Sequence, residues 1–298
     1  MLSGIIPPLL TPFSAEGEVD TGVLCELVDF LLDHGVDGFY VCGTTGEGML
    51  LTEAERCLVV ETTVKQVRDR VPVVAHVGAI ATATAVRLAE HAREAGAYAV
   101  ASVPPFYVPV TPRGIEEHYR RLAQAAGIPL YIYFIPGATN VHVSPHLIAR
   151  LHRDKLISGI KYTSYDQLGF REIIELCNPE LNILSGPDEM LLPFLVMGAH
   201  GGIGTTYNCM PQLYIQLYAA WQAGDMATAR ELQYQVNRVI LILRDHGVIP
   251  ALKSTMRLIG IDPGNPRAPL LPLSPEKEAE LEQDLTAIGF FDSRRPAA

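Results

Sequence analysis

The fold is decided by short apolar segments, of which the clearest is ISGIKYTS at residues 157–164. Its first part is an apolar run typical of a buried β-strand, and the run ends in Lys161 followed by hydroxyl side chains. In barrels built from parallel strands, the catalytic groups gather where the strands end. Lys161 therefore stands where a catalytic amine would lie.

Similar apolar segments alternate with amphipathic stretches up to about residue 224. Eight strands are predicted, at 4–10, 38–42, 71–76, 98–102, 130–134, 157–162, 182–185 and 201–204. The helices predicted between them include 23–33, 53–67, 84–95, 114–126 and 170–176. Eight βα units that close on themselves make an α/β fold of the (β/α)8 TIM-barrel class.

The strand pattern stops after Gly224. Three helices are predicted beyond it, at 225–246, 250–259 and 275–288, with a connector rich in proline and glycine at 262–272. We therefore expect a catalytic barrel domain at 1–224 and a C-terminal helical extension at 225–298.

Composition and charge exclude several classes of partner. The 298 residues include 33 acidic and 23 basic side chains, a net charge of −10, and no dense Lys/Arg run suited to nucleic acid. The five cysteines form no CxxC pair, and no HExxH motif occurs, so no metal or other cofactor is expected. No apolar stretch reaches the roughly 18 residues of a membrane span, so we expect a cytoplasmic protein.

Lys161 is a candidate Schiff-base nucleophile. A free lysine has a pKa of about 10.4, and its amine attacks a carbonyl only when a structured site favours the neutral form. The alternative is a solvated lysine that simply ends the strand.

Other polar residues follow the predicted strands. The turn Gly43-Thr44-Thr45-Gly46-Glu47-Gly48 could hold a carboxylate with its N–H groups and hydroxyls, or be an ordinary tight turn. Tyr133 is the inward-facing tyrosine of its strand, unless it only packs there, and Tyr107 lies at a loop tip. Asp188 and Glu189 could bind a polyhydroxyl substrate or cap the next helix.

Several reaction classes lose support. The chain lacks a GxSxG elbow, a GxGxxG turn after the first strand and a basic phosphate cluster after the last two. The remaining set of lysine, tyrosine and hydroxyl-rich loops suits imine chemistry on a carbonyl.

These motifs together resemble the N-acetylneuraminate lyase and dihydrodipicolinate synthase family of pyruvate-dependent class I aldolases, over essentially the whole chain. The turn at 43–47, Tyr133-Phe134-Ile135-Pro136 and Gly159-Ile160-Lys161 carry the likeness. The resemblance implies that Lys161 forms the imine and that Tyr133 shuttles protons. It implies roles in the proton relay or in substrate binding for Thr44, Thr45, Tyr107, Thr163, Gly186, Asp188, Glu189, Gly204 and Thr205.

Within that family, the segments at 75–78, 186–189 and 201–208 look like the N-acetylneuraminate lyase branch, which cleaves its substrate to pyruvate and N-acetylmannosamine. Ala138 stands where the dicarboxylate-binding synthases carry an arginine. Phe134 and Thr205 depart from the lyase pattern, so an aldolase or dehydratase of another 2-keto-3-deoxy sugar acid stays open. A 4-hydroxy-tetrahydrodipicolinate synthase and a silent keto-acid-binding paralogue are the remaining alternatives. The resemblance also implies a homotetramer in which Tyr107 reaches a neighbouring site.

Overall fold

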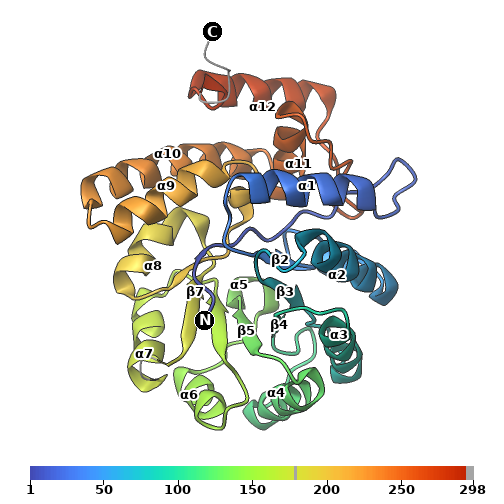
Figure 1. Ribbon diagram of the computed structural model, residues 1–298, viewed down its shortest axis with the longest axis vertical. Helices are drawn as coiled ribbons and strands as arrows, with labels where there is room; N and C mark the ends of the chain where they lie inside the picture. Colours follow the sequence, from blue (N-terminus) through green and yellow to red (C-terminus); the bar gives the residue numbers. More distant parts are fainter. Residues whose placement is uncertain (178–179, 293–298) are drawn as a thin grey trace.

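A computed structural model describes residues 1–177 and 180–292 of the chain (Figure 1). Within these residues, one sheet of eight parallel strands has the order β1-β8-β7-β6-β5-β4-β3-β2. The strands are β1 (Gly4–Ile5), β2 (Phe39–Val41), β3 (Val73–His76), β4 (Ala99–Ser102), β5 (Leu130–Phe134), β6 (Gly159–Tyr162), β7 (Asn182–Ser185) and β8 (Gly201–Gly202).

The two ends of this sheet meet just beyond β1. Pro8 forms a parallel bridge with Tyr40 of β2. The N–H of Tyr40 donates to the carbonyl of Pro7 (3.0 Å), and the N–H of Leu9 donates to the carbonyl of Tyr40 (2.9 Å). The predicted (β/α)8 TIM barrel is therefore confirmed.

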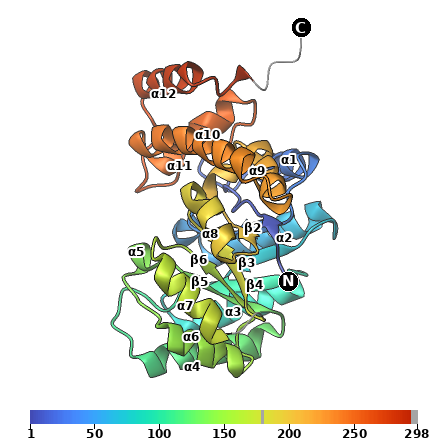
Figure 2. The same ribbon diagram turned by 90° about the vertical axis from the view of Figure 1, so that its left-hand side faces the viewer.

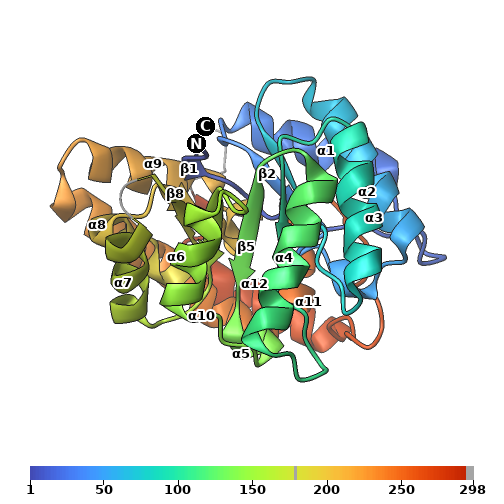
Figure 3. The same ribbon diagram turned by 90° about the horizontal axis from the view of Figure 1, so that it is seen from below.

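Helices surround the strands, as Figures 1 and 3 show. Several begin at side-chain caps; Thr52, for example, forms a full capping box with Glu55. Apolar residues fill both the layer between helices and strands and the barrel interior. The surrounding helices are α1 (Thr21–Asp33), α2 (Glu53–Val67), α3 (Thr82–Glu94), α4 (Pro112–Ala126), α5 (Pro136–Thr139), α6 (Pro145–Arg153), α7 (Gln167–Cys177), α8 (Leu191–Met197) and α9 (Pro211–Gln222).

Six of the eight strands are shorter than the sequence predicted, and β1 and β8 keep only two residues each. The prediction 4–10 is wrong beyond Ile5, because Pro7 and Pro8 have no N–H to donate to a neighbouring strand. The prediction 201–204 overruns β8, since Gly204 already caps the short helix η3 (Thr205–Asn208). Both shortened ends bring loop backbone to the mouth of the barrel.

Three helices follow the barrel, as expected for the C-terminal extension. They are α10 (Met226–Asp245), α11 (Val248–Leu258) and α12 (Pro275–Ala287). α10 packs on α9, and α12 packs on α10 and α11, so that the three helices stack to one side of the barrel (Figure 2). The division at residue 224 stays a prediction, and residues 293–298 lie outside the described part.

None of the helices in the described ranges is both long and apolar enough to cross a membrane.

The amide of Asn182 ties the amino-terminal ends of several strands together. It accepts from the N–H of Leu2 (2.9 Å) and from the hydroxyl of Tyr131 (2.7 Å), and it donates to the carbonyl of Leu2 (2.9 Å). We expect Asn182→Ala to lower the free energy of unfolding by about 2–4 kcal/mol, because three buried partners lose their bonds. Urea unfolding measures this loss.

Tyr131→Phe is the matched control, since it removes only one of the three bonds and should cost about 1 kcal/mol. Equal stability losses in the two variants would contradict the assignment of Asn182 as the tie.

Candidate active site

Lys161 and Tyr133 lie side by side near the carboxyl ends of adjacent strands. β5 pairs with β6 in a register that sets Tyr133 opposite Lys161. The Lys161 side chain is 4% exposed, and its Nζ lies 4.2 Å from the ring centroid of Tyr133 and 4.4 Å from that of Tyr40. Among the described residues, this amine has no hydrogen-bond or ion-pair partner. It is thus buried against two aromatic faces and available to a ligand.

The turn after β2 reaches the same place. The hydroxyl of Thr44 lies 3.2 Å from that of Tyr133, and the hydroxyl of Thr45 lies 2.8 Å from that of Thr205; each pair is hydrogen-bonded. The structure therefore brings together residues from the ends of β2, β5, β6 and β8, as the convergence of strand ends predicted.

The shape of this turn depends on its glycines. A Cβ on Gly48 would lie 1.8 Å from the carbonyl oxygen of Cys42, and one on Gly46 would lie 2.8 Å from the carbonyl oxygen of Leu9. Glu47 adopts a left-handed conformation (φ 53°), and its N–H donates to the carbonyl of Thr44 (3.1 Å). This packing leaves one conformation for the turn.

Thr163 and Gly186 are packed together beside β6. The Thr163 hydroxyl is buried, and it has no hydrogen-bond partner in the described part of the chain. A Cβ on residue 186 would lie 1.8 Å from that oxygen, so only glycine fits. Such an unpaired buried hydroxyl is suited to a ligand.

Asp188 is held by the protein itself. One carboxylate oxygen accepts from the N–H of Thr205 (3.0 Å), and the other accepts from the N–H and hydroxyl of Thr206 (2.6 Å each). Burial raises its pKa to about 6, against the lowering effect of the Thr206 hydrogen bonds. Its oxygens organise the β8 loop, which includes Gly204, rather than capping the helix near Met190.

Glu189 also forms hydrogen bonds within the protein. It accepts a short hydrogen bond from the hydroxyl of Tyr165, and Asn237 of α10 donates to its main-chain carbonyl (3.3 Å). The Glu189 carboxylate raises the pKa of Tyr165 to about 12. Sequence reasoning missed Tyr165, whose only signal was its position two residues after Thr163.

Tyr107 is not brought into this cluster. Its side chain is 88% exposed, its φ is +73°, and its hydroxyl forms no hydrogen bond within the described ranges. A role for Tyr107 in this site therefore stays a prediction that depends on a second subunit.

Two further residues line the site. Tyr40 packs inside the barrel under Lys161, and strand alternation could have found it, since Phe39 and Val41 face outward. His76 packs edge-on against the ring of Tyr133, with centroids 5.6 Å apart, and its Nδ1 lies 3.0 Å from the carbonyl oxygen of Cys42. Burial lowers the pKa of His76 well below its usual value, so this neighbour of Lys161 is neutral.

Over residues 1–177 and 180–292, no group of three His, Cys, Asp or Glu side chains is placed to hold a metal ion.

A (β/α)8 barrel with a buried lysine, a tyrosine and a hydroxyl-bearing glycine turn at its mouth is the arrangement of an imine-forming enzyme. Residues 1–288 match the model of the dihydrodipicolinate synthetase family, and the chain belongs to that family.

Relatives with different activities match almost equally well. The N-acetylneuraminate lyase of Rhizobium meliloti is 37% identical over 96% of this chain and 95% of its own length. The 4-hydroxy-tetrahydrodipicolinate synthase of Maridesulfovibrio salexigens is 35% identical over 97% and 99%. The crystal structure of YagE, a prophage protein of the same family from E. coli K12 in complex with pyruvate, superposes with a TM-score of 0.92 at 28% identity, covering 97% and 99% of the two chains.

The Thr206 hydroxyl stabilises the ionised form of Asp188, which gives a pH-dependent prediction. Because its pKa is raised to about 6, Asp188 destabilises the folded protein as pH rises through the range between its ordinary value and 6. Thr206→Val removes a charge-assisted bond, so we expect a loss of about 2 kcal/mol at pH 8 and a smaller loss at pH 5. Urea unfolding at both pH values measures it.

Thr255→Val is the control, because the Thr255 hydroxyl donates only to the carbonyl of Ala251 (2.8 Å). Its stability loss should be the same at both pH values. An equally pH-independent loss in Thr206→Val would contradict the role given to the Asp188 charge.

Proposed function

We propose that this protein is a class I aldolase that cleaves N-acetylneuraminate to pyruvate and N-acetylmannosamine through an imine on Lys161. The observation that carries the proposal is the buried Lys161 amine, which contacts the rings of Tyr40 and Tyr133 and has no hydrogen-bond or ion-pair partner among the described residues. The family match and the lyase relative support the same chemistry.

In the proposed reaction, the neutral Lys161 amine attacks the C2 ketone of the open-chain keto acid, and water leaves to form the imine. The hydroxyls of Thr44 and Thr45, with the N–H groups of their turn, hold the carboxylate. Tyr133 gives its phenolic proton to the carbinolamine hydroxyl, which leaves as water, and becomes a phenolate. This phenolate takes the proton of the C4 hydroxyl as the C3–C4 bond breaks, and the electron pair of that bond enters the protonated imine. Protonation at C3 and hydrolysis then release pyruvate. The Thr44–Tyr133 hydrogen bond (3.2 Å) links the turn that holds the carboxylate to the residue that transfers the proton.

In this proposal, the loops at the barrel mouth determine the choice of substrate. Position 138, in α5, carries an exposed alanine, so no guanidinium there grips a second carboxylate. The unpaired Thr163 hydroxyl, the main chain at Gly186 and Gly204, and the side chains of Glu189 and Thr205 offer polar groups for the sugar portion. This favours a sugar acid over the substrate of a dicarboxylate-binding synthase.

A shorter 2-keto-3-deoxy sugar acid is the second candidate. Both oxygens of Asp188 accept hydrogen bonds from the β8 loop, and Glu189 accepts from Tyr165. Because Asp188 and Glu189 already accept hydrogen bonds within the protein, fewer acceptors are left for the distal hydroxyls of a long sugar.

The proposed enzyme is a homotetramer in the cytoplasm. In that assembly, the exposed Tyr107 joins the proton relay of a neighbouring subunit through Thr45. Its left-handed backbone conformation, which a tyrosine rarely adopts, is consistent with a functional position. A Tyr107→Phe variant with unchanged turnover would contradict this role.

Borohydride trapping tests the imine directly. Incubation with N-acetylneuraminate followed by reduction should leave a pyruvate-sized adduct on Lys161, located by peptide mapping. Lys161→Arg should form no adduct and show no turnover, because a guanidinium does not form the imine. The exposed Lys65→Arg is the control and should behave like the wild type.

Adduct formation by pyruvate but not by N-acetylneuraminate would keep the aldolase chemistry and assign the substrate to the shorter sugar acids. Turnover by Lys161→Arg would refute the mechanism.

Tyr165→Phe separates the two substrate candidates. The change releases the Glu189 carboxylate without altering the imine-forming residues. If the tyrosine holds Glu189 away from long sugars, kcat/KM for N-acetylneuraminate should rise by about tenfold relative to a six-carbon 2-keto-3-deoxy acid. A fall for N-acetylneuraminate would instead mean that the Tyr165–Glu189 pair binds the long sugar as a unit.

A further inference from the structure

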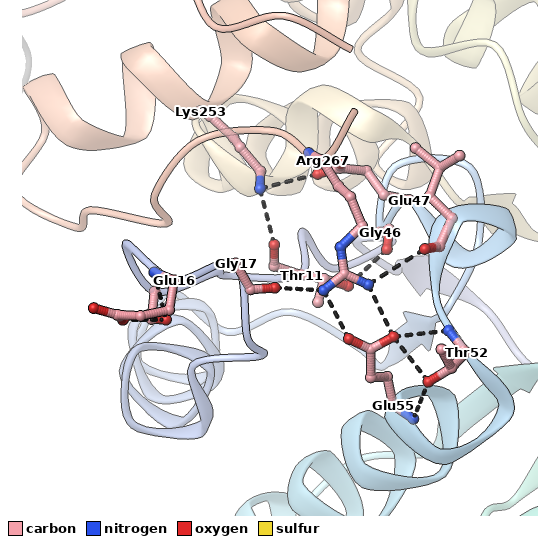
Figure 4. Close-up of polar contacts among 11 residues, drawn as sticks. Thr11, Glu16, Gly17, Gly46, Glu47, Thr52, Glu55, Lys253 and Arg267 are labelled. Atoms are coloured by element: carbon pink, nitrogen blue, oxygen red, sulfur yellow. Dashed lines mark hydrogen bonds and ion pairs between the residues drawn. The ribbon is translucent and has the colours of Figure 1, made fainter. Parts of the chain in front are cut away.

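The C-terminal extension contacts the carboxylate-binding turn through a buried lysine. Lys253 of α11 has a side chain 1% exposed, and its Nζ lies 2.9 Å from Oε1 of Glu47, whose side chain is 0% exposed. The same amine donates to the carbonyls of Thr11 (3.0 Å) and Asn265 (3.1 Å), as Figure 4 shows in part. A buried cation from the extension therefore lies beside the turn.

The contact holds the turn from two directions. Glu47 belongs to the turn itself, two residues after Thr45. Thr11, whose carbonyl accepts from Lys253, donates through its hydroxyl to the carbonyl of Gly46 (2.6 Å). Lys253 thus fixes one turn residue by an ion pair and another by a short chain of hydrogen bonds.

Arg267, from the connector before α12, fixes the far side of the turn (Figure 4). Its main-chain N–H donates to Oε2 of Glu47 (2.6 Å). Its guanidinium donates to both carboxylate oxygens of Glu55 (2.7 and 2.8 Å), the residue that completes the capping box of α2. Both ends of the segment from Glu47 to Glu55 are therefore anchored to the extension.

The charge of Glu47 explains why a cation stands there. A carboxylate buried in the turn would repel the carboxylate of a keto acid held by the same turn, because the interior screens charge weakly. Burial lowers the pKa of Lys253, and the neighbouring Glu47 opposes that shift. Buried ion pairs add little net stability compared with apolar packing, so stability alone does not account for the pair.

We propose that Lys253 is a positioning residue for keto-acid binding: it neutralises Glu47 and fixes the turn, so that Thr44 and Thr45 face the ligand carboxylate without a repelling charge beside it. The inference rests on the proposed function of this turn. It assigns to the C-terminal extension a direct part in substrate affinity, without contact between Lys253 and the substrate.

The test compares a charged ligand with its uncharged ester. Pyruvate and methyl pyruvate both present a ketone to Lys161, but only pyruvate carries a negative charge. Borohydride trapping followed by intact-protein mass gives the half-saturating concentration of each, and their ratio, pyruvate over methyl pyruvate, is the readout. A general loosening of the fold would raise both concentrations and leave the ratio unchanged.

Lys253→Met leaves Glu47 without its cation and should raise the ratio about tenfold or more. Glu47→Gln leaves no negative charge at the turn and should keep the ratio at or below the wild-type value. The double variant Lys253→Met with Glu47→Gln should return the ratio close to that of the wild type. Arg257→Met is the control, since Arg257 of the same helix pairs with Asp262 and Glu278 of the extension.

Equal shifts for both ligands in Lys253→Met, or no rescue in the double variant, would overturn the inference. If Lys253→Met does not fold, a raised ratio in Glu47→Gln is sufficient by itself to overturn the inference. Failure of the wild-type protein to trap pyruvate would instead overturn the proposed function, and the inference with it.

Discussion

The register between β5 and β6 is the constraint on which the candidate active site depends. It sets Tyr133 opposite Lys161, and a slip of one residue would turn the lysine outward into the helix layer. The same register is fixed at the other end of the strands by Gly159. A Cβ there would lie 2.3 Å from both the carbonyl of Asn182 and the ring of Tyr131. Close packing around Gly159 therefore fixes the register that places the Lys161 amine near the mouth of the barrel.

The buried charged groups around this mouth are stabilised in different ways. Asp188 accepts three hydrogen bonds from the β8 loop, and Lys253 pairs with Glu47. Lys161 has only the faces of Tyr40 and Tyr133. The first two groups have their partners within the protein and shape loops. Lys161 differs because, under our proposal, its polar partner is the ligand itself.

The sequence predicted the features of the site that follow from strand positions, and it missed the contacts that form between segments far apart in the chain. The bounds of β5 and β7 were correct, and the approach of Thr44 to Tyr133 followed from the convergence of strand ends in a barrel. The pairing of Lys253 with Glu47 had no local signal, because it joins the extension to the second βα turn. Asp188 was predicted to bind substrate or to cap a helix. Its carboxylate accepts hydrogen bonds from the β8 loop because β7 and β8 lie side by side, and a role in substrate binding stays a prediction.

The same division explains why relatives with different substrates are almost equally similar to this chain. The strand ends and the glycine turn serve the imine, which the lyase and the synthase share under our proposal, and they occupy little of the sequence. In the same proposal, the part of the substrate beyond the keto acid contacts the loops, where Ala138 presents no cation and Tyr165 donates a hydrogen bond to Glu189. The identities of 37% and 35% are spread over almost the whole chain, so a few loop positions contribute very little to the overall identity. Under our proposal, the hydrogen bond between Tyr165 and Glu189 decides whether a carboxylate near the barrel mouth is free to accept a sugar hydroxyl, so that substrate choice depends on a few contacts rather than on overall similarity.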